Sequence, residues 1–125
     1  MPENVLVVED DEATRFLLEF SLRREGYQVS VAMEGIGGIE SIRHHVPDIV
    51  ITNLNMPRLD GLGLVKRIRK DLHLNALPII VLSGARNQDP RAIIIAGASV
   101  FLCKPVELTE LNECVKIALD AKRPL

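Results

Sequence analysis

The sequence has little cysteine, no apolar run of membrane length and no large excess of charge of either sign. Its two cysteines, Cys103 and Cys114, form neither a metal-ligand spacing nor a disulfide framework, and free thiols favour the cytoplasm. No signal peptide or membrane-length segment is recognisable after Met1. A pI near 5.9 gives no electrostatic basis for binding nucleic acid or a membrane surface. We therefore expect a cytoplasmic protein or domain.

The composition itself is that of an ordinary globular domain. The chain has 125 residues, of which 47% are hydrophobic and 26% charged, enough to bury a core of its own. No repeat, linker or low-complexity tract divides it. We expect residues 1–125 to form one domain, either alone or as part of a longer chain.

Apolar runs alternate with segments of helical periodicity along the chain. Ile49, Val50 and Ile51 are typical of a strand buried on both faces, which ends at Asn53. Residues 27–32 instead alternate polar with apolar, as an edge strand does. The pattern predicts an α/β fold, a flavodoxin-like (βα)5 doubly wound parallel sheet with strand order 2-1-3-4-5. The predicted strands are 5–8, 27–32, 49–53, 79–82 and 100–103, and the predicted helices are 12–25, 35–46, 62–72, 90–96 and 107–121.

The first helix also predicts part of the core. Phe16, Leu17 and Phe20 recur at helical spacing, and we expect them on the stripe that faces the sheet. Gly26 should end this helix.

Polar side chains follow two neighbouring strands of the predicted sheet. Glu9 and Asp10 come after the first strand, and Asn53 ends the third. In an open parallel sheet, ligands collect beyond the carboxyl ends of the strands. Adjacent carboxylates repel each other unless a cation neutralises them, and oxygen ligands favour Mg²⁺ over a transition metal. The sequence therefore predicts a magnesium site at this edge.

Two further strand ends supply Ser83 and Lys104. A hydroxyl and an ammonium beside a metal are suited to holding a phosphoryl group, because Lys offsets its charge and Ser donates a hydrogen bond. Taken singly, each has a plainer interpretation as a turn residue or a solvated charge. Their joint placement at strand ends favours the functional interpretation.

In order and spacing, six short motifs resemble the receiver domain of two-component response regulators, the CheY-like superfamily. The resemblance covers residues 3–121. The motifs are Val7-Val8-Glu9-Asp10-Asp11, Pro47-Asp48-Ile49-Val50, Asn55-Met56-Pro57-x-x-Asp60-Gly61, Pro78-Ile79-Ile80 through Ser83, Ala96-Gly97-Ala98 and Lys104-Pro105.

The resemblance implies a role for each polar residue at the strand ends. Asp10 would hold Mg²⁺ directly, Glu9 would act mainly through water, and the backbone carbonyl of Asn55 would be a further ligand. Ser83 and Lys104 would contact the phosphoryl oxygens.

The resemblance also implies a conformational switch. Phe101 stands at the position of the family's switch aromatic, whose rotamer follows the Ser83 hydroxyl. The Lys104–Pro105 bond would be cis, which places the lysine ammonium in the site.

Asn53 is the one departure from the family pattern, because receivers accept phosphate on an aspartate at this position. A carboxamide is neutral and its nitrogen lone pair is delocalised, so it is a poor nucleophile. The change also removes one negative charge from the metal site. We therefore expect no phosphorylation at Asn53 and weakened Mg²⁺ binding, with the amide oxygen still able to coordinate.

Two explanations of Asn53 are open. It is either an engineered, nearly isosteric block on phosphorylation or a feature of a natural receiver that signals without it. Retention of Glu9, Asp10, Ser83 and Lys104 favours a site built for phosphate and silenced at one position.

The expected partners follow from the resemblance. They are a sensor histidine kinase or phosphotransfer protein, and a downstream effector or a second copy that docks on the fourth helix, fifth strand and fifth helix. The fourth helix contains Ile93, Ile94 and Ile95, which cannot all face one core. Ile94 aligns with the buried position of the family, so we expect Ile95 or Ile93 on the surface.

An enzyme is the alternative from another class. Asp10-Asp11-Glu12-Ala13-Thr14 faintly resembles the Asp-x-Asp-x-Thr signature of haloacid-dehalogenase-type magnesium-dependent phosphatases, with Glu in place of the second acid. A chain of 125 residues leaves little room for the larger core and cap of that family. We expect a signalling module and not an enzyme.

Overall fold

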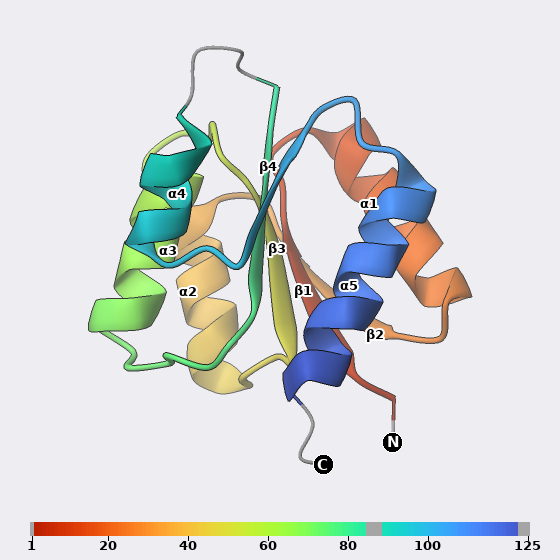
Figure 1. The fold of residues 1–125 in the computed structure, drawn as a ribbon, viewed down its shortest axis with the longest axis horizontal. Coiled ribbons are helices and arrows are strands. Elements are labelled where there is room, and N and C mark those ends of the chain that lie inside the picture. Colours follow the sequence, from red (N-terminus) through yellow and green to blue (C-terminus); the bar gives the residue numbers. More distant parts are fainter. Residues whose placement is uncertain (1, 85–88, 123–125) are drawn as a thin grey trace.

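The computed structural model describes residues 2–84 and 89–122, in which five strands alternate with five helices (Figure 1). The strands are β1 (Asn4–Val8), β2 (Gln28–Ala32), β3 (Ile49–Asn53), β4 (Ile79–Ser83) and β5 (Val100–Cys103). The helices are α1 (Glu12–Arg24), α2 (Gly35–His44), α3 (Gly61–Lys70), α4 (Pro90–Ala96) and α5 (Leu108–Lys122).

All strand pairs of the sheet are parallel, in the order β2-β1-β3-β4-β5. The predicted fold and strand order are therefore confirmed, with β2 at one edge. Because β1 lies between β2 and β3, with Val8 opposite Thr52, the segments that follow β1 and β3 leave the sheet side by side. The sequence predicts a site at this carboxyl edge, where the strands end.

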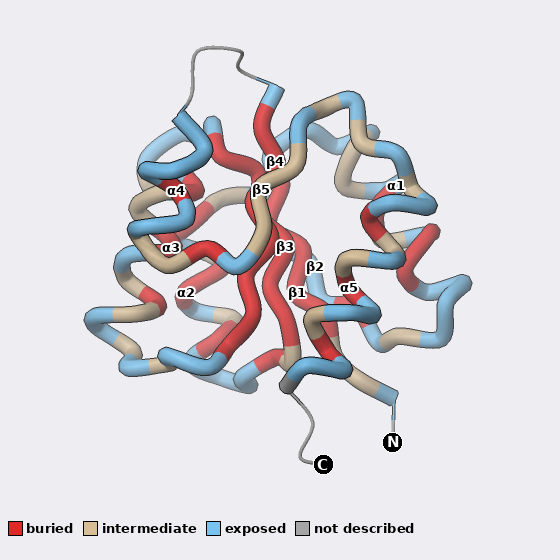
Figure 2. The backbone as a smooth tube through the Cα atoms, viewed as in Figure 1, coloured by how far each residue is buried: buried red, intermediate tan, exposed pale blue. Residues whose placement is uncertain are grey.

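Helices cover both faces of the sheet, and each layer has its own apolar core. Helices α1 and α5 lie on one side, and α2, α3 and α4 on the other (Figure 1). The strands β1, β3 and β4 are buried along almost their whole length (Figure 2). Burial on both faces explains why these strands read as continuous apolar runs, whereas β2 carries exposed residues.

The inward stripe of α1 differs from the prediction. Phe16, Leu17 and Phe20 are exposed, and the buried residues of the helix are Leu18, Ser21 and Leu22. Leu18 and Leu22 are four residues apart and belong to the same apolar cluster as Val5 and Val7 of β1. The helix thus carries two apolar stripes, and periodicity alone could not tell which one faces the sheet.

Helix α4 buries a different isoleucine from the one expected. Ile93 is buried, whereas Ile94 is exposed and Ile95 is 85% exposed. Asp89 caps the helix by accepting a hydrogen bond from the backbone of Arg91, with Pro90 in the first turn. This start sets Ile93 against the core of the α2–α4 layer. Of the two residues expected on the surface, Ile95 is exposed and Ile93 is buried, and the expected burial of Ile94 is wrong.

Within the described residues, none of the helices combines the length and apolarity that crossing a membrane requires.

Candidate functional site

The carboxyl edge of the sheet gathers charged and polar groups from three strands. Glu9 and Asp10 follow β1, Asn53 ends β3, and Lys104 follows β5. Their side chains are linked in two hydrogen-bonded pairs, Lys104 with Glu9 and Asn53 with Asp10. Asn53 and Asp10 are 43 positions apart in the sequence and Lys104 and Glu9 are 95 apart. The parallel sheet brings the members of each pair together.

Glu9 is a fully buried carboxylate with both oxygens engaged. Its Oε1 accepts from Lys104 Nζ at 2.7 Å, and its Oε2 accepts from the backbone N–H of Asp11 at 3.1 Å. A buried carboxylate is costly unless it is paired and hydrogen-bonded. Lys104, whose side chain is only 23% exposed, provides that pairing. The Lys104–Pro105 peptide bond is cis, as expected.

The Asn53 side chain points its nitrogen at two acceptors. Nδ2 donates to Asp10 Oδ1 at 3.0 Å and to the backbone carbonyl of Asn55 at 2.9 Å. With the amide turned over, Oδ1 would face these same two oxygens and all three would repel. The hydrogen bonds therefore fix the orientation of the amide. Its NH₂ group faces the oxygens that the family resemblance assigns to a metal ion.

The surroundings of Asp10 stabilise its charged form. Burial acts to raise the pKa of its carboxyl group. Hydrogen bonding with the side chains of Glu9 and Asn53 and with its own backbone, together with attraction to Lys104, outweighs this effect and lowers the pKa of Asp10. Asp10 is therefore an anion at neutral pH, and the Asn53 amide is one of the groups that stabilise its charge.

A hydrogen bond and a close backbone contact hold the loop after β3 against the end of that strand. Gly61 N–H donates to the carbonyl of Leu54 at 2.7 Å, and Asp60 caps α3 by accepting from Gly63 N–H at 2.8 Å. A Cβ at Gly61 would collide with the backbone of Asn53 and Leu54, which accounts for the glycine of the Asp60-Gly61 motif. This contact fixes the ends of the segment that carries the Asn55 carbonyl.

Ser83 and Phe101 lie on β4 and β5. Ser83 is buried at the end of β4, and its carbonyl accepts from the Lys104 N–H at 2.8 Å. Phe101 lies on β5, opposite Val81 of β4, and its partly buried side chain packs against the core of the α2–α4 layer. Both residues occupy the strands that the sequence predicted, and their roles in a switch remain a prediction.

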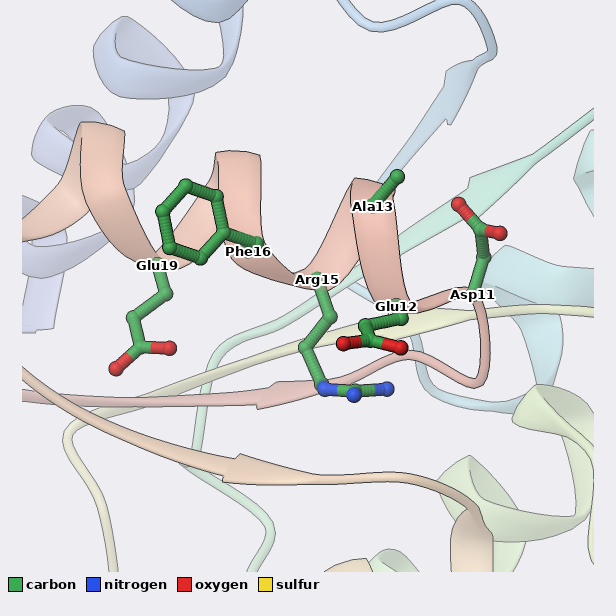
Figure 3. Close-up of a pocket in the computed structure, with 6 residues that line it drawn as sticks. All are labelled: Asp11, Glu12, Ala13, Arg15, Phe16 and Glu19. Carbon is green, nitrogen blue, oxygen red and sulfur yellow. The ribbon is translucent and has the colours of Figure 1, made fainter.

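Two contacts at this edge were missed from the sequence. Arg15 Nη1 donates to the Glu9 carbonyl at 3.0 Å. Asp11 caps α1, with Oδ2 accepting from the hydroxyl of Thr14 at 2.6 Å and from its backbone N–H at 2.9 Å, and these hydrogen bonds lower the pKa of Asp11. Asp three residues before Thr was the available signal for the cap. Beside them, the start of α1 borders a surface depression lined by Asp11, Glu12, Ala13, Arg15, Phe16 and Glu19 (Figure 3).

The ligand atoms at this edge are oxygens, which a hard cation prefers. The site has one carboxylate fewer than it would have with an aspartate at position 53. Asp10, the Asn55 carbonyl and the Asn53 amide offer oxygen ligands of the kind that Mg²⁺ prefers. Among residues 2–84 and 89–122, no three His, Cys, Asp or Glu side chains come together as a potential metal site. To use its oxygen, Asn53 has to rotate its amide and give up two hydrogen bonds.

The fold and this polar edge define the CheY-like class of flavodoxin-like domains. The profile of the response regulator receiver domain matches residues 5–116, and the chain belongs to this family. It is 40% identical over 125 residues to the response regulator MprA of Mycobacterium sp. (strain KMS) and 35% identical over 118 residues to the transcriptional regulatory protein AfsQ1 of Streptomyces coelicolor.

A solved structure agrees with this assignment. The receiver domain of the Francisella response regulator 1452 superposes with a TM-score of 0.91 at 27% identity, covering 97% of this chain and 99% of that one. The match to MprA covers 99% of this chain and 54% of MprA, and the match to AfsQ1 covers 93% and 51%. The chain therefore spans about half the length of these curated relatives.

Removing the partner of Glu9 should destabilise the fold. We expect Lys104→Met to lower the free energy of unfolding by roughly 2–4 kcal/mol, because it leaves a buried carboxylate unpaired. Adding Glu9→Gln to Lys104→Met should recover part of the loss, since no buried charge then remains. Urea unfolding measures both, with Lys66→Met on the exposed face of α3 as the matched control, expected within about 0.5 kcal/mol of the parent. Equal stability of Lys104→Met and the control would contradict a stabilising ion pair.

Proposed function

We propose that residues 1–125 form one receiver domain of a two-component phosphorelay, with Asn53 at the phosphoacceptor position. The observation that carries this proposal is the meeting of Glu9, Asp10, Asn53 and Lys104 at one edge of the sheet. Ser83 and Lys104 would contact phosphoryl oxygens, and Ser83 and Phe101 would pass the change to the rest of the domain. The domain signals by protein–protein contact and is not itself an enzyme.

Asn53 silences the phosphotransfer step in this proposal. Transfer needs a carboxylate oxygen that attacks phosphorus and forms an acyl phosphate, while the donor's leaving group departs with the bond electrons. The Asn53 amide has no such oxygen. Its nitrogen already donates to Asp10 and to the Asn55 carbonyl, so neither its chemistry nor its orientation suits attack.

The same amide would weaken magnesium binding. Glu9, Asp10, Asn53 and the Asn55 carbonyl are the groups that would hold Mg²⁺, and a bound ion would neutralise the charge of an incoming phosphoryl group. Here Lys104 is paired with Glu9, and the Asn53 NH₂ group faces two of the expected ligand oxygens. A cation therefore has to displace hydrogen bonds that already satisfy the site.

Asn53→Asp should restore magnesium affinity. We expect the variant to bind Mg²⁺ about tenfold or more tightly than the parent, because it adds a carboxylate and removes the competing NH₂ group. Titration calorimetry measures the change. Asn75→Asp is a matched control, because it adds the same charge at an exposed position before β4, at the opposite edge of the sheet. Equal Mg²⁺ affinity in the parent and in Asn53→Asp would refute a role for Asn53 in weakening the site.

Phosphorylation of the restored acceptor tests the function directly. The parent and Asn53→Asp are incubated with acetyl phosphate and Mg²⁺, and their intact masses are compared. We expect one added phosphoryl group on Asn53→Asp only, with acetate released. Asp10→Asn in the Asn53→Asp background should abolish it, since Asp10 would hold the metal. An unmodified Asn53→Asp protein would identify the chain as a degenerate receiver and overturn the silenced-site proposal.

We propose two kinds of partner, each at a different surface. A sensor histidine kinase or phosphotransfer protein would approach the carboxyl edge of the sheet. A downstream effector or a second copy would dock on the α4-β5-α5 face, where Ile94 and Ile95 are exposed on α4. Both processes are expected in the cytoplasm, in keeping with the free Cys103 and Cys114.

The exposed isoleucines supply a test of that face. We expect Ile95→Glu to abolish effector binding without changing stability, because the side chain is 85% exposed and a charge there cannot enter an apolar contact. A pull-down of the effector measures binding, and thermal unfolding checks the fold. Unchanged effector binding would show that Ile95 is an isolated surface residue.

The phosphatase alternative is not favoured. The family that matches residues 5–116 is the receiver family. Asp10, which would be the phosphatase nucleophile, is hydrogen-bonded to Asn53. Thr14, the last residue of the faint signature, is hydrogen-bonded to Asp11 in the cap of α1.

A further inference from the structure

The outward face of α1 carries an unusual concentration of aromatic surface. Two of the three phenylalanines in the chain lie there, Phe16 at 68% and Phe20 at 52% exposure, and Leu17 beside them is half exposed. Single exposed apolar residues are common on protein surfaces, but grouped large ones often mark an interaction site. In this chain they leave the inner stripe of Leu18 and Leu22 to pack against the sheet.

Four exposed residues follow one another at intervals of four along this face. They are Glu12, Phe16, Phe20 and Arg24, and residues four apart are neighbours on a helix surface. The rings of Phe16 and Phe20 are stacked, with centroids 6.4 Å apart and planes at 19°. The Arg24 guanidinium lies over the Phe20 ring, 5.9 Å from its centroid. We call these four residues the α1 stripe.

The α1 stripe is complementary to itself when its direction is reversed. A two-fold axis midway between Phe16 and Phe20 brings Phe16 of one copy to Phe20 of the other. The same rotation brings Glu12 to Arg24 at both ends. A parallel pairing would instead place Glu12 against Glu12 and Arg24 against Arg24. Rows of residues four apart also interdigitate in the commonest packing class of helix pairs.

The charge pattern of the α1 stripe favours a second copy over a partner of one charge sign. Its two charges are opposite and lie at opposite ends, so the stripe has no net charge. The adjacent Glu19 and Arg23 are already paired with each other at 2.8 Å. A reversed copy of the same helix meets both charges and the aromatic centre together, which is the self-complementarity that a two-fold interface requires.

We propose that the α1 stripe is a self-association surface at which two copies of this chain pair with their α1 helices antiparallel. Figure 3 shows its start, with Glu12 and Phe16 at the border of the surface depression. A single helix pair buries less area than a standard stable interface. The association is therefore weak, and it appears as a monomer–dimer equilibrium at high protein concentration.

Sedimentation equilibrium from micromolar to millimolar protein tests the pairing. The parent should form dimers as its concentration rises, and Phe16→Ser should remain monomeric. Ile117→Ser is the matched control and should dimerise like the parent, because Ile117 on α5 is also 68% exposed. A parent that is monomeric at millimolar concentration overturns the proposal. Loss of dimers in Ile95→Glu but not in Phe16→Ser places the interface on α4 and also overturns it.

Charge reversal tests the antiparallel geometry. Glu12→Arg and Arg24→Glu should each weaken self-association about tenfold, because each turns two attractive pairs into two repulsive ones. An equimolar mixture of the two variants should dimerise again, as each repulsive copy meets its complement. The double variant should also recover. Thermal unfolding confirms that both single variants are folded. Single variants that dimerise like the parent, or a mixture that stays monomeric, overturn the antiparallel pairing.

Discussion

The parallel direction of the strands is the constraint on which this molecule depends. Because all five strands end at the same edge, the chain has to leave the sheet there several times within a small volume. Glu9, Asp10, Asn53 and Lys104 meet at this edge although they are far apart in the sequence. A receiver needs such an edge to hold an ion and a phosphoryl group, and the fold has to stabilise the charges when neither is bound.

In this chain the protein supplies that stabilisation from its own side chains. Lys104 neutralises the buried Glu9, and the Asn53 amide donates two hydrogen bonds to oxygens that would otherwise face each other. An aspartate at position 53 would add a third negative charge and could donate no hydrogen bond while ionised. In the proposed receiver, Asn53 would therefore change both the nucleophile and the charge of the site, because its amide donates hydrogen bonds where an aspartate would bring a further negative charge.

The parts of the structure that could be predicted were those with one physical solution. A run such as Ile49-Val50-Ile51, short, β-branched and bounded by polar residues, is typical of a strand covered on both sides, and parallel strand ends bring Glu9, Asp10 and Asn53 together. The prediction of which α1 residues are buried was wrong, because Phe16–Phe20 and Leu18–Leu22 are both apolar pairs at helical spacing. Only packing against the sheet decides which pair is buried. The direction of the Asn53 amide likewise depends on acceptors that the fold brings close.

The exposed apolar residues of α1 and α4 form two separate surfaces. Helices α1 and α4 lie on opposite sides of the sheet (Figure 1), and each exposes apolar residues that its inner stripe does not need, Phe16 and Phe20 on one and Ile94 and Ile95 on the other. Two copies joined through α1 would leave α4 uncovered in both, so self-association would not compete with a partner on that helix. Because the pair would present two α4 helices, it would bind a two-fold effector more tightly than a monomer could, without any new contact.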